Sequence, residues 1–123
     1  MSSELLRQLQ HSEKKAKKEL KNRLGIHSPF ATLTDEEISL VLALRAKSLR
    51  ISQNKKQKEL SKEAGLSAST TYANFEQKGT ISLINFIKMM RAFGRLEEIE
   101  GLLKPTVKED IEQIDTVSKK RVR

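Results

Sequence analysis

The stretch QKELSKEAGLSASTTYANFEQKG, residues 57–79, decides how this chain folds. Its first part places Leu60 and Ala64 four residues apart, which predicts a short helix over 56–64 that Gly65 ends. Its second part places Tyr72 and Phe75 three residues apart, which predicts another helix with a buried aromatic side. Only three or four residues separate the two helices, so we expect a tight turn between them.

Helix signals flank this stretch on both sides. Thr34 and Glu37 form a capping box, which predicts a core helix from about Asp35 to about Ser52. Downstream, Ser82 caps a helix that Gly94 closes, and a short fifth helix is expected over 96–103. No alternation of period two extends over any length, so no sheet is predicted.

These patterns predict a five-helix, all-α domain over residues 35–103. We expect its core to form around Leu60, Tyr72, Phe75, Phe86 and Met90. The buried side of the fourth helix is predicted to carry Leu83, Phe86, Ile87, Met90 and Phe93. The inward side of the fifth is predicted to carry Leu96, Ile99, Leu102 and Leu103.

The remaining segments differ from this domain in composition. Residues 1–24 are expected to form a basic N-terminal helical extension, and residues 25–34 a linker. Residues 104–123 are expected to form a C-terminal tail, with one amphipathic helix through Ile111, Ile114 and Val117. We expect its basic end, SKKRVR (118–123), to be disordered.

Charge is unevenly distributed along the chain, whose formal net charge is +8. Residues 45–95 hold eleven basic and three acidic groups, whereas 25–44 sum to −3 and 96–117 to −5. A basic centre between acidic segments is expected of a domain that binds a polyanion, although a solubilising surface explains the charge equally well.

Composition also excludes several classes of protein. The absence of cysteine excludes disulfides, cysteine zinc sites and thiol catalysis. No apolar run is long enough for a membrane span, and the first residues lack the apolar core of a signal peptide. We therefore expect a cytoplasmic protein without a membrane partner, and one associated with the nucleoid only if the basic centre binds DNA.

The order of these elements resembles the Xre/Cro, or lambda-repressor-like, helix-turn-helix family. That family's usual pattern has a Gln, a Leu with a small residue, Gly-Leu-Ser or Gly-Val-Ser, an aliphatic position, and a Glu before a Gly-containing loop. The matching residues here are Gln57, Leu60, Ser61, Gly65, Leu66, Ser67, Phe75, Glu76 and Gly79. The resemblance extends over roughly residues 35–103 and includes the helix after Ser82.

One departure from the family concerns register. Gly65 and Glu76 are eleven residues apart, one more than in common members of the family. Burial of Tyr72 and Phe75 is more favourable than burial of Thr71 and Asn74, so the extra residue is assigned to the turn within 66–69. The outward face of the second helix is then Ser69, Thr70, Ala73, Asn74 and Gln77, with Thr71 at its margin.

The resemblance implies that this outward face binds double-stranded DNA. By it, residues near the helix start and Asn74 read bases, while residues around both ends of the motif contact phosphates. The DNA-binding set is Lys55, Lys56, Gln57, Ser67, Ala68, Ser69, Thr70, Thr71, Asn74, Gln77 and Lys78, with Thr80 as a further phosphate contact. The resemblance also implies a structural pair between Arg50 and Glu76, which fixes the angle of the helix.

No catalytic set emerges, and no metal or cofactor is expected, since His11 and His27 both lie outside the compact domain. We expect a homodimeric repressor that binds a palindromic operator, acting as the antitoxin of a toxin–antitoxin operon that it autorepresses. The segment after residue 75 looks like regulators encoded beside HipA-type kinases, which would make such a kinase a partner. The alternatives are a stand-alone repressor without a toxin, and a protein-interaction module that does not read DNA.

Overall fold

The computed structural model describes the backbone of residues 2–121, and the side chains of residues 3–15 and 23–114. All regular elements in this part of the chain are helical, which confirms the all-α class. The elements are α1 (Ser2–Arg23), the 3₁₀ turn η1 (Phe30–Thr32), α2 (Asp35–Ser52), α3 (Gln57–Ala64), α4 (Ser69–Lys78), α5 (Leu83–Phe93), α6 (Leu96–Glu100) and α7 (Val107–Arg121).

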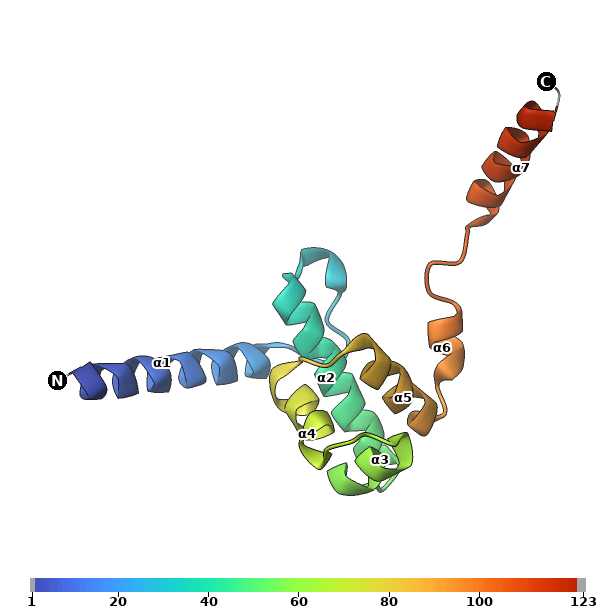
Figure 1. The fold of residues 1–123 in the computed structure, drawn as a ribbon. Coiled ribbons are helices and arrows are strands. Elements are labelled where there is room, and N and C mark those ends of the chain that lie inside the picture. Colours follow the sequence, from blue (N-terminus) through green and yellow to red (C-terminus); the bar gives the residue numbers. More distant parts are fainter. Residues whose placement is uncertain (1, 122–123) are drawn as a thin grey trace.

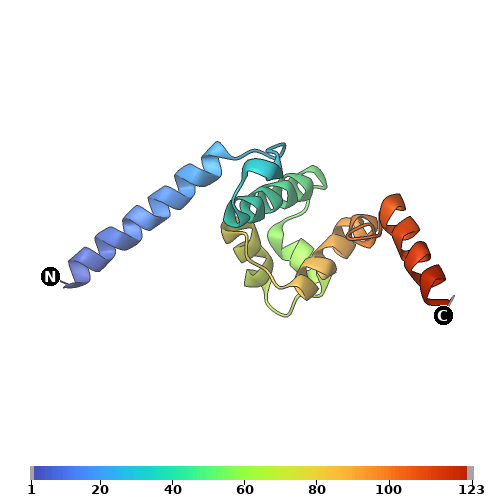
Figure 2. The ribbon, with the colours of Figure 1, turned by 90° about the horizontal axis from the view of Figure 1, so that it is seen from above.

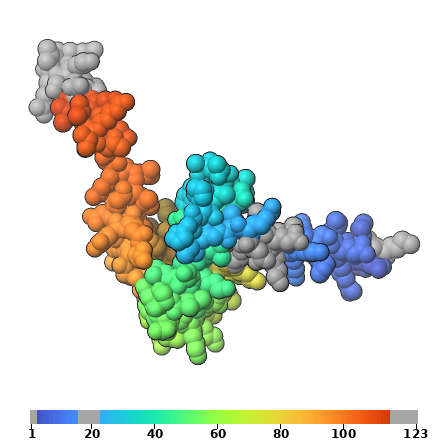
Figure 3. All heavy atoms as spheres, turned by 180° about the vertical axis from the view of Figure 1, so that it is seen from behind, coloured from blue at the N-terminus to red at the C-terminus, as the bar shows by residue number. Residues whose placement is uncertain are grey.

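The body of the molecule is built from α2 to α6, and α1 and α7 project from it on opposite sides (Figures 1 and 2). Within the body, α4 packs against α2 and α3, while α5 packs against α3 and α6. The space-filling view from behind shows the same division between the body and the projecting α1 and α7 (Figure 3).

Local signals explain where α2 to α5 begin and end. The Thr34 hydroxyl accepts from the Glu37 amide at 3.2 Å, and the Glu37 carboxylate accepts from the Thr34 amide at 2.9 Å. This capping box starts α2 at the expected residue. Asn54, just after α2, adopts a left-handed conformation with φ of 56°, which ends the helix. The hydroxyl of Ser82 caps α5, as predicted.

An aromatic cluster forms the centre of the core. Tyr72 is fully buried, and its ring lies 6.5 Å from that of Phe75 and 6.4 Å from that of Phe93. Phe75 in turn meets Phe86 edge-on at 6.0 Å. The buried cluster comprises Ala43, Ala46, Leu60, Tyr72, Phe75, Met89 and Phe93. The predicted burial of Leu60, Tyr72 and Phe75 is therefore confirmed.

The predicted inward faces of the last two core helices need correction. In α5, Met89 is buried, whereas Phe86 and Met90 are half-buried and Leu83 is 72% exposed. Phe93 is buried as predicted, Phe86 and Met90 pack against the buried cluster, and Met89 joins that cluster from outside the predicted set, on the helix that packs against α3.

The short helix α6 also ends earlier than predicted. It stops at Glu100, and Leu102 and Leu103 are 64% and 100% exposed rather than inward. Leu103 adopts a left-handed backbone conformation, with φ of 58°, so the chain turns away from the body there.

The segment over 25–34 folds against α2 instead of forming a free linker. Arg45 donates from Nε to the carbonyl oxygen of Ile26 at 2.7 Å, and its guanidinium carbon lies 4.9 Å from the centre of the Phe30 ring. In the tail, α7 continues through residues 118–121, where we expect disorder from the sequence. Residues 122–123 lie outside the described part.

Candidate nucleic-acid interface

Helix α4 has one buried face and one exposed face. Tyr72, Phe75 and Glu76 are at most 3% exposed and anchor the helix to α2, α3 and α5. The exposed side chains on the other face are Ser69, Thr70, Asn74 and Gln77, while Thr71 and Ala73 are half-buried. The register counted back from Glu76 predicts this division except at Ala73, which was expected on the outward face.

The turn before α4 holds residues 65–68. Gly65 adopts a left-handed conformation with φ of 71°, and the amide of Leu66 donates to the carbonyl oxygen of Ser61 at 3.0 Å. Ser61 is only 3% exposed, and its hydroxyl lies 3.4 Å from the carbonyl oxygen of Ser69. A small residue at 61 lets α3 and the start of α4 approach closely.

A buried ion pair fixes the far end of α4. Arg50 donates from Nε to Glu76 Oε2 at 2.6 Å and from Nη2 to Oε1 at 3.2 Å. Its third nitrogen, Nη1, donates to the carbonyl oxygen of Lys55 at 2.8 Å, which ties the start of α3 to the same point. The side chains of Arg50 and Glu76 are 12% and 4% exposed, so solvent screens their interaction weakly.

The pKa values around this pair follow from its contacts. Burial by itself raises the pKa of Glu76, but hydrogen bonds led by that from Arg50 outweigh burial and hold the pKa below its ordinary value. The hydrogen bond to Glu76 likewise raises the pKa of Arg50. Burial, and then the neighbouring Glu76 carboxylate, raise the pKa of the Tyr72 hydroxyl. The group therefore stays as a charged pair beside a neutral phenol at neutral pH.

Two residues of the expected DNA-binding set have partners within the protein. Gln57 is half-buried, and its Nε2 donates to Glu76 Oε1 at 3.0 Å. Lys55 Nζ lies 2.7 Å from Glu63 Oε2 and 3.4 Å from the carbonyl oxygen of Ala92. The sequence did not indicate these contacts, because residues 8 to 37 positions apart meet only in the folded chain.

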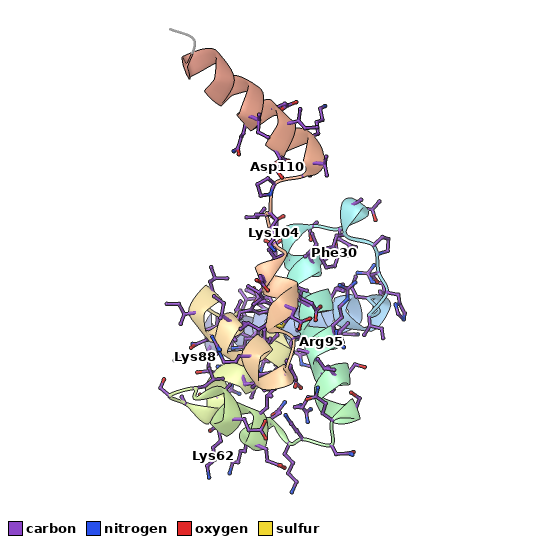
Figure 4. All side chains as sticks on the ribbon, turned by 90° about the vertical axis from the view of Figure 1, so that its right-hand side faces the viewer. Phe30, Lys62, Lys88, Arg95, Lys104 and Asp110 are labelled. Carbon is purple, nitrogen blue, oxygen red and sulfur yellow. The ribbon has the colours of Figure 1, made fainter. Side chains whose placement is uncertain are left out.

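The rest of the expected set is open to solvent. Its exposed members are Lys56, Ser67, Ala68, Ser69, Thr70, Asn74, Gln77 and Lys78. They lie on the turn and α4 or at the start of α3, so the fold brings them to one part of the surface. Sequence reasoning missed Lys58 and Lys62, which are exposed one turn apart on α3; Lys62 points away from the body in Figure 4. Their four-residue spacing was the available signal.

Other kinds of site find little support in the described residues. His11 and His27 are both exposed, and no three His, Asp or Glu side chains of the described part gather closely enough to hold a metal ion. Within the same part, no helix combines the length and apolarity needed to cross a bilayer.

Comparison of the chain with protein-family models, curated proteins and solved structures finds no match in any of the three.

Proposed function

We propose that this chain is a sequence-specific, double-stranded DNA-binding transcriptional repressor of the Xre/Cro helix-turn-helix type. The observation that carries the proposal is the structure of α4. Its aromatic and acidic side chains are buried, while Ser69, Thr70 and Asn74 present donors and acceptors on the opposite side. Such side chains on a helix of the body can meet base edges in the major groove.

The rigidity of α4 supports the same proposal. Base readout requires that a helix enter the groove at a defined angle, which calls for anchors at both ends. Gly65 and Ser61 hold the first turn close to α3, and the Arg50–Glu76 pair holds the last turn to α2. Gln57 is assigned to this anchoring group through its bond to Glu76 rather than to phosphate binding.

Charge around the exposed face of α4 also favours a polyanion. Lys56 lies at the N-cap of α3, Lys58 and Lys62 lie along it, and Lys78 ends α4. All four are exposed, so they are available for phosphates that flank the major groove. Lys55 contributes less, because Glu63 already neutralises its charge.

The proposal is tested by selecting duplexes from a random pool with the full chain and then measuring binding against salt. We expect one palindromic sequence, bound about 10³-fold or more tightly than random duplex. Affinity should fall steeply with salt, and Lys78→Gln should reduce that slope by about 1 for each protomer bound, without changing the preferred sequence. Glu100→Gln, on the exposed end of α6, serves as a control substitution. Weak binding with no preferred sequence would favour the protein-interaction module.

A second candidate function, that of an antitoxin, is favoured by the N-terminal helix. Leu5, Leu6 and Leu9 are 55–59% exposed on α1, which stands away from the body (Figure 1). Apolar side chains of this kind suit a protein partner better than DNA. Co-purification of a kinase encoded beside this chain, abolished in a Leu6→Asp, Leu9→Asp variant that still binds DNA, would support the antitoxin role. DNA binding without any such partner would leave a stand-alone repressor.

A further inference from the structure

An apolar groove lies on the body beside α5. It has a volume of about 480 Å³ and runs between α2, α5, the start of α6 and the segment before α2. Its lining includes Leu42 and Leu49 of α2 and Phe86, Met90 and Phe93 of α5. All of these except Phe93 are only half-buried, so the groove presents apolar surface that the body itself does not cover.

Helix α7 carries an apolar stripe of matching character. Val107, Ile111 and Ile114 are 77%, 55% and 65% exposed, and they lie at the spacing of four and seven residues that places side chains on one helix face. An amphipathic helix that lays such a stripe into an apolar groove is a common mode of recognition. In the structure α7 lies away from α2 and α5, whose side chains line the groove, as Figures 1 and 2 both show.

The charges of the groove and of α7 are complementary. Arg45, Arg95 and Glu98 line the groove, and Arg95 pairs with Glu98 at 3.1 Å, so Arg45 supplies the net positive charge of these three residues. On α7, the first turn carries Glu109 and Asp110, and Asp110 adjoins the apolar stripe. In Figure 4, Arg95 lies on the body whereas Asp110 lies well beyond Lys104, so these groups do not meet within one chain. Acidic side chains beside an apolar stripe fit a groove that arginines line.

The connection between α6 and α7 favours exchange between two copies. Residues 101–106 are exposed, and Pro105 keeps Lys104 in extended conformations. Leu103 turns the chain away from the body, and the three residues 104–106 between it and α7 span about 10 Å when extended. A helix on such an arm reaches the groove of a neighbouring molecule, and in a two-fold dimer both grooves are filled at once.

We propose that the groove beside α5 binds α7 of a second copy of this chain, and that this reciprocal contact forms the homodimer. The inference deepens the proposed function, because a palindromic operator is bound by a dimer. The proposed contact identifies the two surfaces that form that dimer. Val107, Ile111 and Ile114 fill the groove, and Asp110 beside them faces Arg45.

The test measures the molar mass of the full chain by light scattering over micromolar concentrations, without DNA. The wild-type chain is expected to be a dimer. Ile111→Asp with Ile114→Asp should raise the dimer dissociation constant at least about tenfold, because two buried side chains become charged. Both residues are exposed within one chain, so the fold should persist, as circular dichroism would verify. Gln113→Asp adds charge on another face of α7 and should leave the dimer intact.

A second pair of variants tests the groove itself. Ser48 lines it and is exposed on α2. Ser48→Glu should weaken the dimer by repelling the acidic α7, whereas Ser48→Lys should preserve it. A monomeric wild-type chain, or a dimer that tolerates the α7 variant or Ser48→Glu, would overturn the inference. If the dimer behaves as expected but neither the wild-type chain nor any variant binds duplex DNA, the proposed DNA-binding function is wrong, whereas the proposed dimer contact is retained.

Discussion

Glu76 is the residue on which the placement of α4 depends. It is 3% exposed, it receives two donors from Arg50, and a third comes from Gln57. A carboxylate at this depth is tolerated only because these donors replace water. Arg50 also reaches the carbonyl oxygen of Lys55, so one guanidinium joins α2, α3 and α4.

The first prediction at this scale concerns pH. Arg50→Gln should lower the free energy of unfolding at pH 7 by about 3 kcal/mol, because Glu76 stays buried without its charged partner. In the wild type, the lowered pKa of Glu76 means that the pair stabilises fully above the ordinary value of 4.5 and progressively less as pH falls below it. This acid-induced destabilisation should be absent in Arg50→Gln.

Urea unfolding between pH 3 and 7 would measure both effects. The control is Arg95→Gln, which removes a similar ion pair with Glu98 at 3.1 Å. Both of those side chains are about half exposed, so the substitution should change stability little. Equal effects of the two substitutions would show that burial of the Arg50 pair is not what matters.

A second residue-scale prediction concerns Asn74, which is exposed in the middle of α4. If its amide pairs with adenine, Asn74→Ala should cost about 1–3 kcal/mol at one base pair per half-site and relax preference there alone. Binding of the variant to operators changed at each position would measure this. An unaltered preference at all positions would remove Asn74 from base readout.

At the scale of elements, close packing of α2 against the end of α4 depends on Gly79. Its φ is +76°, and a methyl group there would lie 3.1 Å from the backbone of Ser39. Gly65 has a similar φ of +71° but open space around it. Substitutions at the two glycines can therefore be compared. The comparison separates the free-energy cost of a side chain at positive φ from the cost of a steric clash between helices.

Gly65→Ala should destabilise the chain by about 1–2 kcal/mol, the cost of a side chain at positive φ. Gly79→Ala should destabilise it by clearly more, because α2 must also move away from α4. Thermal or denaturant unfolding of both variants would measure the difference. Equal destabilisation of the two variants would mean that the helices adjust without cost.

At the scale of the whole molecule, charge is carried by segments outside the body as well as by the body. Residues 118–123 alone contribute +4, and they follow a segment of 96–117 that sums to −5. The acidic part of α7 is the part we assign to the dimer contact, which leaves the basic end available for DNA phosphates.

Removal of residues 118–123 should therefore weaken binding to all duplexes about equally. It should also reduce the slope of log affinity against log salt by about 0.9 for each phosphate that the basic end neutralises in the full chain. Titrations of operator and random duplex at several salt concentrations would measure this, with the dimer checked by light scattering. A collapse of specificity would instead assign base readout to this end.

The helices of this chain were largely determined by local sequence. Capping residues and left-handed stops act within a few positions, so Thr34, Glu37, Asn54, Gly65 and Ser82 could be interpreted without knowing the fold. Tyr72 and Phe75 likewise set the register of α4, because burying these two side chains is more favourable than burying any other pair within one turn. The Arg50–Glu76 pair followed from the resemblance alone.

Only the tertiary structure decided which side of each helix faces the core and which polar residues are already engaged. Met89 is buried beside the predicted Met90, and Leu83, Leu102 and Leu103 are exposed, because burial depends on how neighbouring helices pack. The partners of Gln57 and Lys55 within the protein likewise became visible only in the folded chain. Local propensity acts through neighbours in sequence, whereas burial and ion pairing depend on residues that only folding brings together.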